Sequence, residues 1–172
     1  MIASEPGGYH VFVSHSSDDK GVAEAVCAAL EAEGLRCWMA PRDIVPGKGW
    51  GEAIIEGIGK SWVMVVVFSE AANQSTYVLR EVERAVSRGM PIIPIRIEDV
   101  APSAELELFL SVPHWLNAVT PPMESHYRQL VSTVHAVLGE LDGGVIADEE
   151  VNGWVPNSKS IQRTCQTSLT RR

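Results

Sequence analysis

Apolar residues in this chain alternate between strand-like runs and helical stripes. Four runs have the length and composition of β-strands, at residues 9–14 (YHVFVS), 35–39 (LRCWM), 62–68 (WVMVVVF) and 91–97 (PIIPIRI). The continuous apolar run 62–68 predicts a strand buried on both faces, whereas Pro94 places 91–97 nearer an edge of the sheet, because proline cannot donate to a ladder. A short fifth strand is expected at 114–116.

Helical patterns separate these strands. Apolar residues three or four positions apart predict four helices, within residues 22–30, 50–58, 78–86 and 127–138. The first follows a polar capping segment at 16–19 and ends at Gly34. Alternating strands and helices predict an α/β fold with right-handed crossovers. Five strands favour a flavodoxin-like parallel sheet in the order 2-1-3-4-5, with helices on both faces.

The chain length of 172 residues fits one domain. Residues 1–8 end in Pro-Gly-Gly and are predicted to form a flexible arm, and residues 9–138 carry the strand and helix patterns. Hydrophobic periodicity stops at Gly139, so we expect residues 139–172 to be a linker or tail. The tryptophans of the predicted strands, Trp38, Trp62 and Trp115, are expected in the core.

Composition narrows the functional classes. Hydrophobic residues make up 45% of the chain and charged residues 21%, which is typical of a globular domain. A net charge of −8 argues against general binding of nucleic acid, whose phosphates an acidic surface repels. The basic residues of 159–172 lie in polar sequence and do not change this expectation.

Three cysteines, Cys27, Cys37 and Cys165, lack metal or redox spacing. Cys27 and Cys37 have apolar neighbours and are expected to be buried free thiols, which favours a reducing compartment. The first residues have no apolar stretch, and no apolar run is long enough to span a membrane. We therefore expect a cytoplasmic protein without a membrane partner.

Candidate chemistry gathers where the predicted sheet reverses direction, at the carboxyl ends of the first and third strands. Segments 14–19 and 69–77 reach this crevice, and 40–50 lies beside it. Tyr77 and Glu81 lie one helical turn apart at its rim. Glu81 is either a functional carboxylate or a solvated acid paired with Arg84, and periodicity alone favours the solvated acid.

Several familiar kinds of site are not supported, because the chain lacks their motifs. Ser69 stands where a phosphoacceptor receiver domain needs an aspartate. The chain has no G-x-G-x-x-G after a strand, no G-x-x-x-x-G-K-[ST] and no G-x-S-x-G, so dinucleotide oxidoreductases, P-loop proteins and serine hydrolases are not supported. The five histidines are scattered without metal spacing, so we expect no metal site.

Four segments, taken in order, resemble those of TIR (Toll/interleukin-1 receptor/resistance) domains. Residues 9–20 (YHVFVSHSSDDK) resemble the opening motif, and 40–47 (APRDIVPG) resemble the BB loop in its bacterial form. The run 62–68 followed by Tyr77-x-x-x-Glu81 resembles the catalytic segment, and 109–116 (FLSVPHWL) the last motif. Each motif is short, but the ordered set covers residues 9–138.

This resemblance implies a flavodoxin-like fold and one of two functions. Many bacterial and plant members cleave NAD⁺ between nicotinamide and ribose, releasing nicotinamide and ADP-ribose or a cyclic form of it. Other members are non-catalytic adaptors that act through TIR–TIR contacts. The resemblance implies NAD⁺ as a substrate with no cofactor, and self-association with other TIR domains that activates the enzyme.

The resemblance also assigns residues to roles. Glu81 corresponds to the catalytic glutamate, His15 and Ser16 to the lining of the nucleotide pocket, and residues 42–47 to a loop that gates it. Tyr77 stands where active members often have tryptophan.

Four other residues complete the candidate substrate site. Ser69 ends the third strand, and Trp50 belongs either to the core or to the pocket wall. Arg42 and Asp43 form a loop ion pair, a nucleotide contact or a TIR–TIR contact, and we favour the last.

Overall fold

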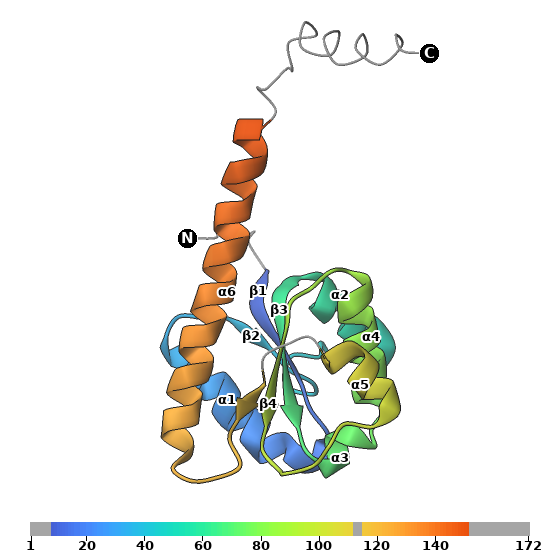
Figure 1. Cartoon of the computed structure of the whole chain (residues 1–172). Coiled ribbons are helices and arrows are strands. Elements are labelled where there is room, and N and C mark those ends of the chain that lie inside the picture. The colour runs from blue at the N-terminus through green and yellow to red at the C-terminus, as the bar shows by residue number, and fades with distance from the viewer. Residues whose placement is uncertain (1–7, 112–114, 152–172) are drawn as a thin grey trace, which may run out of the picture.

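The computed structural model describes residues 8–111 and 115–151, with side chains described as far as Leu141 (Figure 1). Five parallel strands form one sheet in the order β2-β1-β3-β4-β5. The strands are β1 (Tyr9–Ser14), β2 (Cys37–Trp38), β3 (Ser61–Phe68), β4 (Ile92–Arg96) and β5 (Leu116–Asn117). The predicted fold class and strand order are confirmed.

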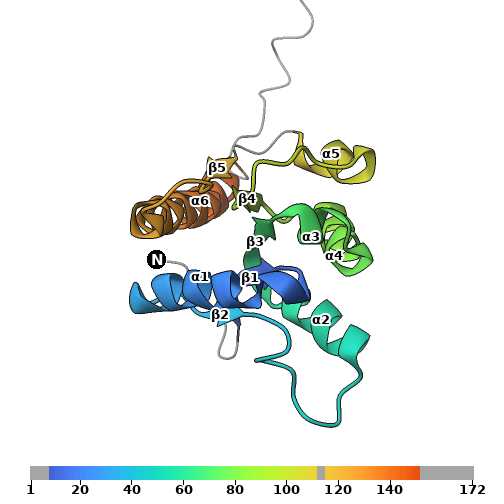
Figure 2. The same ribbon diagram turned by 90° about the horizontal axis from the view of Figure 1, so that it is seen from below.

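Helices cover both faces of the sheet (Figure 2). They are α1 (Lys20–Ala32), α2 (Trp50–Gly59), α3 (Glu70–Asn73), α4 (Thr76–Ser87), α5 (Ala104–Leu110) and α6 (Met123–Val151), with a short 3-10 helix η1 (Ser17–Asp19) before α1. One face packs against α1 and α6, and the other against α2, α3, α4 and α5. Residues of β3 alternate between these two cores, as the doubly buried run predicts.

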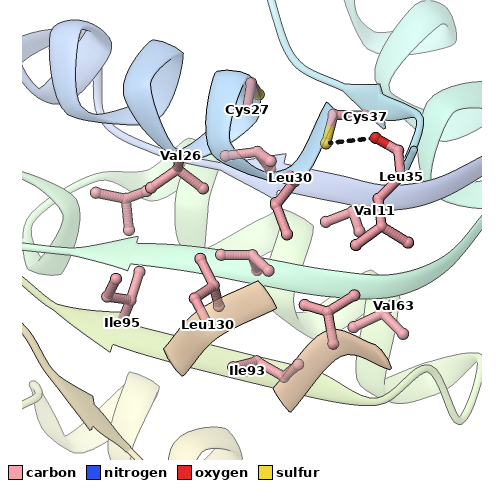
Figure 3. Packing of buried hydrophobic residues seen from close by; sticks show 14 of the residues in the cluster. Val11, Val26, Cys27, Leu30, Leu35, Cys37, Val63, Ile93, Ile95 and Leu130 are labelled. Carbon is pink, nitrogen blue, oxygen red and sulfur yellow. Dashed lines mark hydrogen bonds between the residues drawn. The ribbon is translucent and has the colours of Figure 1, made fainter. Parts of the chain in front are cut away.

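Figure 3 shows the core under α1 and α6, which contains both described cysteines. Cys27 and Cys37 are free and buried, as predicted, and the Cys37 thiol donates to the Leu35 carbonyl at 3.6 Å. Cys165 lies outside the described residues. In the described part of the chain, His, Cys, Asp and Glu form no metal-binding group of three or more, and no helix is long and apolar enough to span a membrane.

Two of the three strand tryptophans pack in the core as expected. Trp38 is buried and stacks on Phe12, with ring centroids 4.8 Å apart and an interplanar angle of 13°. Trp115 is half-buried and meets Phe68 edge-on. The core prediction for Trp62 is wrong, since this residue is 40% exposed. It stands near the start of β3, where it lines an open cavity at the amino edge of the sheet.

Near the ends of the chain, the structure differs from the predicted element boundaries. Helix α6 continues past the predicted boundary at Gly139 to Val151, because no proline interrupts this stretch and Leu141 still packs against the core. Glycines at 139, 143 and 144 weaken a helix by only about 1 kcal/mol each. The fifth strand, predicted at 114–116, is Leu116–Asn117 in the structure. His114, the first residue of the predicted strand, lies outside the described residues. Residues 1–7 and 152–172, predicted to be an arm and a tail, also lie outside them.

Candidate active site

A cleft of about 460 Å³ opens at the carboxyl edge of the sheet, between the end of β1, the loop after β2, and helices α2 and α4. This is the edge at which the sheet order predicts a ligand site. The lining residues are Phe12, Val13, His15, Ser16, Ser17, Lys20, Ala40, Pro41, Trp50, Ile54, Ser75, Tyr77 and Glu81.

Glu81 is the buried acid of this cleft. It lies on α4 between Val78 and Val82, which face the core, and only 8% of the residue is exposed. The Ser14 hydroxyl, at the end of β1, donates to Glu81 Oε2 at 2.5 Å. The described residues show no ion pair between Glu81 and Arg84, so the interpretation of Glu81 as a solvated surface acid is wrong.

The environment of Glu81 brings the pKa of its carboxyl into the neutral pH range. Burial raises the pKa of this carboxyl to about 7, and the hydrogen bond from Ser14 partly opposes the rise by stabilising the charged form. Both protonation states are therefore populated near neutral pH. A carboxyl with such a pKa in a cleft is typical of a functional group.

The residues after β1 form one wall of the cleft. His15 lines it, and burial lowers the pKa of the imidazole, which keeps the ring neutral near pH 7. Ser16 is buried, and its hydroxyl accepts a hydrogen bond from the Asp18 backbone N–H at 3.3 Å, which caps η1. Lys20, at the start of α1, also lines the cleft.

Two aromatic residues flank the opening. Trp50 begins α2 and is 50% exposed, and Tyr77 lies in the first turn of α4 and is 64% exposed. Of the two alternatives for Trp50, the structure places it in the cleft wall and not in the core. The cleft thus has a ring one helical turn from its buried carboxyl.

Three predicted site residues lie away from the cleft lining. Ser69 is buried, donates to Asp19 Oδ2 at 2.5 Å, and caps α3 by accepting from the Ala72 N–H. Burial raises the pKa of Asp19. The role of Ser69 here is to fasten the end of β3 to η1.

Arg42 and Asp43 form the loop ion pair that was one of their three alternatives, at 2.9 Å. Arg42 also pairs with Glu31 at 2.8 Å and donates to the Cys37 carbonyl, while Asp43 accepts from the Met39 N–H. Both side chains tie the loop to the edge of the sheet beside the cleft.

Sequence reasoning placed Ser14 at the crevice but gave it no role in the site. Its position as the last residue of the first strand, on the ligand edge, was visible in the pattern. Its contact with Glu81 was not, because the two residues are 67 positions apart and meet only through the packing of α4 on β1.

Comparison with known proteins gives the chain a family. A family model described as a TIR domain matches residues 11–131. The chain is 34% identical over 97 residues to a probable 2′ cyclic ADP-D-ribose synthase, BdTIR, from Brachypodium distachyon, a match covering 55% of this chain and 43% of that protein. It is 30% identical over 86 residues to a stimulator of interferon genes protein from Magallana gigas, covering 49% and 21%. The chain thus spans less than half the length of these curated relatives.

Solved structures agree on the fold. The TIR domain of the Toll-related receptor TRR-2 from Hydra magnipapillata superposes with a TM-score of 0.63 at 21% identity, covering 74% of this chain and 98% of that one. A TIR-STING receptor from C. gigas gives a TM-score of 0.62 at 21% identity, covering 77% and 41%. With a family model matching residues 11–131, this chain belongs to the TIR domain family.

Proposed function

We propose that this domain is an NAD⁺ nucleosidase that cleaves the bond between nicotinamide and ribose. The products are nicotinamide and ADP-ribose or a cyclic ADP-ribose, made in signalling or defence. The observation that carries the proposal is the buried Glu81 carboxyl, held in a cleft of about 460 Å³ one helical turn from Tyr77. Similarity to BdTIR, named as a probable cyclic ADP-ribose synthase, supports it.

The chemistry suits a single carboxylate. When the bond from ribose C1′ to the nicotinamide nitrogen breaks, its electron pair leaves with nicotinamide, which becomes neutral without accepting a proton. Positive charge then develops on the ribosyl ring, and a nearby carboxylate stabilises it. Water attacks C1′ and loses a proton to give ADP-ribose. In a cyclic product, a hydroxyl, which loses its proton, or an adenine ring nitrogen of the same ADP-ribosyl cation attacks C1′ in place of water. The reaction requires no cofactor.

The rest of the cleft suits a dinucleotide. Tyr77 offers a ring that can stack on nicotinamide, and Trp50 adds a second aromatic surface to the cleft lining. His15 and Ser16 supply polar groups on the wall after β1. Ala40 and Pro41, the first residues of the loop 40–49, line the cleft, so self-association that fixes the rest of this loop over the cleft would complete the pocket.

The thiols support a proposal for the compartment in which this activity takes place. Two buried free cysteines support a reducing compartment, and we propose that the domain acts in the cytoplasm. A net charge of −8 supports partners other than nucleic acid.

A direct test is nicotinamide release from NAD⁺ by the purified chain over a range of protein concentrations. We expect turnover per molecule to rise with concentration, because self-association orders the loop. The alternative function is a non-catalytic adaptor, which the exposed apolar side chains of Val45 and Trp50 favour because they suit contact with another TIR domain. Self-association with NAD⁺ left intact at every concentration would reject the enzyme and support the adaptor.

The pKa of Glu81 sets an expected pH dependence. Because the charged form stabilises the ribosyl cation and the pKa is raised to about 7, kcat/KM should rise with pH through neutrality. Below that pKa the rate should fall about tenfold per pH unit. Rates measured between pH 5.5 and 8.5, with circular dichroism to show that the fold persists, check this. A profile that is already flat at pH 5.5 would contradict it.

A further inference from the structure

The hydrogen bond between Ser14 and Glu81 joins two elements that are both fixed by packing. Ser14 is 1% exposed and sits opposite Val66 in the register of β1 and β3, so the sheet holds its backbone. Glu81 projects from α4, whose apolar side packs on the same sheet. A bond of 2.5 Å between two such groups restricts the carboxyl to one orientation.

The direction of this bond leaves half of the carboxylate free. An ionised carboxylate only accepts hydrogen bonds, so Ser14 is the donor and Oε2 the acceptor. Among the described residues, the one side-chain nitrogen or oxygen that is buried without a partner is Arg96 Nε. Glu81 Oε1 accepts no hydrogen bond from a described residue and is not among such buried atoms, so it must be accessible. Since Glu81 lines the cleft, we infer that Oε1 is accessible from the cleft.

We propose that Ser14 is a positioning residue for the nucleosidase reaction. By holding Oε2, its hydroxyl turns Oε1 toward the substrate and stabilises the charged form of the acid. This inference rests on the proposed function of Glu81 and adds a second residue to it. Ser14 itself does not line the cleft and so acts only through Glu81.

Other groups near Glu81 do not take this role. The titratable side chains that share the cleft are His15 and Lys20, from the segment after β1, and Tyr77 on α4. Helix α2 contributes Trp50 and Ile54, which are uncharged, and α3, α5 and β4 contribute no residue to the lining. Burial is the main cause that raises the pKa of Glu81, and the hydrogen bond from the Ser14 hydroxyl lowers it.

The test follows the ionisation of Glu81 itself, using the variant Ser14→Ala. NMR titration of the Glu81 side-chain carboxyl carbon, assigned with Glu81→Gln, gives its midpoint without any turnover. Because the lost hydrogen bond stabilised the charged form, we expect a higher midpoint in Ser14→Ala than in wild type. The rise of kcat/KM with pH should move in the same direction, with a loss of about tenfold or more at pH 6 that shrinks as the pH is raised. The loss should lie mainly in kcat.

Two further variants control for packing. Ser61→Ala removes a strand hydroxyl at the opposite edge of the sheet, where it donates to the Gly57 carbonyl at 2.8 Å, and should leave the Glu81 midpoint unchanged. Ser14→Thr keeps the hydroxyl and should titrate like wild type. The same midpoint in wild type and Ser14→Ala would overturn the proposal, as would a Ser14→Thr midpoint that follows Ser14→Ala.

The titration and the turnover separate the two proposals. A wild type that releases no nicotinamide, but whose Glu81 midpoint moves in Ser14→Ala, would reject the nucleosidase and with it the catalytic purpose of Ser14. An active wild type whose midpoint does not respond to Ser14→Ala would reject the positioning role alone.

Discussion

Replacing Glu81 with glutamine is expected to lower kcat for nicotinamide release by about 10²–10³, which corresponds to the removal of one preorganised electrostatic group worth about 2.7–4 kcal/mol. Glutamine has the size of glutamate, and its amide oxygen can still accept from Ser14, so the cleft keeps its shape and loses only a charge. KM should change little, because this charge acts on the cation that develops during bond cleavage. Single-turnover and steady-state nicotinamide release measure both constants.

The matched control for this substitution is Glu83→Gln on the same helix. Glu83 is exposed, outside the cleft lining, so this variant makes the same chemical change in solvent and should keep wild-type activity. Equal rates in wild type and Glu81→Gln would show that Glu81 is not the catalytic carboxylate.

Glu81→Gln should raise the free energy of unfolding at neutral pH, although it lowers activity. The pKa of Glu81 is raised in the folded protein to about 7, so the native state binds an extra proton between its ordinary value near 4.5 and 7. Wild type therefore loses stability as the pH rises through that window, by about 3 kcal/mol in total. Glu81→Gln lacks this loss, and its advantage in unfolding free energy should be larger at pH 8 than at pH 4. Urea unfolding at both values shows whether an inactive variant is also a well-folded one.

Gly57→Ala is expected to destabilise the domain by about 1–3 kcal/mol, the usual range for overpacking a core. A Cβ at Gly57 would lie 2.6 Å from two ring carbons of Trp38, closer than atoms can pack. Trp38 cannot easily move, because its ring is buried and also stacks on Phe12 with ring centroids 4.8 Å apart. Since Phe12 lines the cleft, nicotinamide release should fall together with stability.

Gly59→Ala is the control for this prediction, since it lies two residues further along α2 and a Cβ there meets nothing within 4 Å. Alanine generally favours a helix over glycine by up to about 1 kcal/mol, so this variant should be neutral or slightly stabilising. Urea unfolding of both variants compares them with wild type. Equal midpoints for Gly57→Ala and Gly59→Ala would mean that the contact between α2 and Trp38 is looser than the structure shows.

Local pattern predicted the sheet well because each strand and helix carries its own periodicity. The run 62–68 predicted β3, and strand–helix alternation was enough to predict the order of the sheet. Pattern failed where the outcome depends on neighbours distant in sequence. Trp62 looks like a core residue within its run, but it lines the open cavity at the amino edge of the sheet and is 40% exposed.

At the candidate site too, local pattern was not sufficient where contacts join residues distant in sequence. Topology predicted Glu81 and Tyr77 at the carboxyl edge of the sheet, where both line the cleft, whereas helical periodicity alone favoured an exposed Glu81. Neither Ser14 nor Ser69 lines the cleft, and each donates a hydrogen bond to a different buried acid. Ser69 turns to Asp19 at 2.5 Å, and Ser14 turns to Glu81 at the same distance. No spacing in the sequence distinguishes these two serines.

Helix α6 has a mechanical consequence. It runs along one face of the sheet and leaves the domain at the edge opposite the cleft, past Leu141, which lines the amino-edge cavity (Figure 1). From Gly139 to Val151 it extends by about 20 Å, at 1.5 Å per residue. Any module joined to the end of α6 would be held away from the cleft. One such module could be exchanged for another without altering the cleft. Self-association of the module would still set the distance between the clefts of neighbouring molecules.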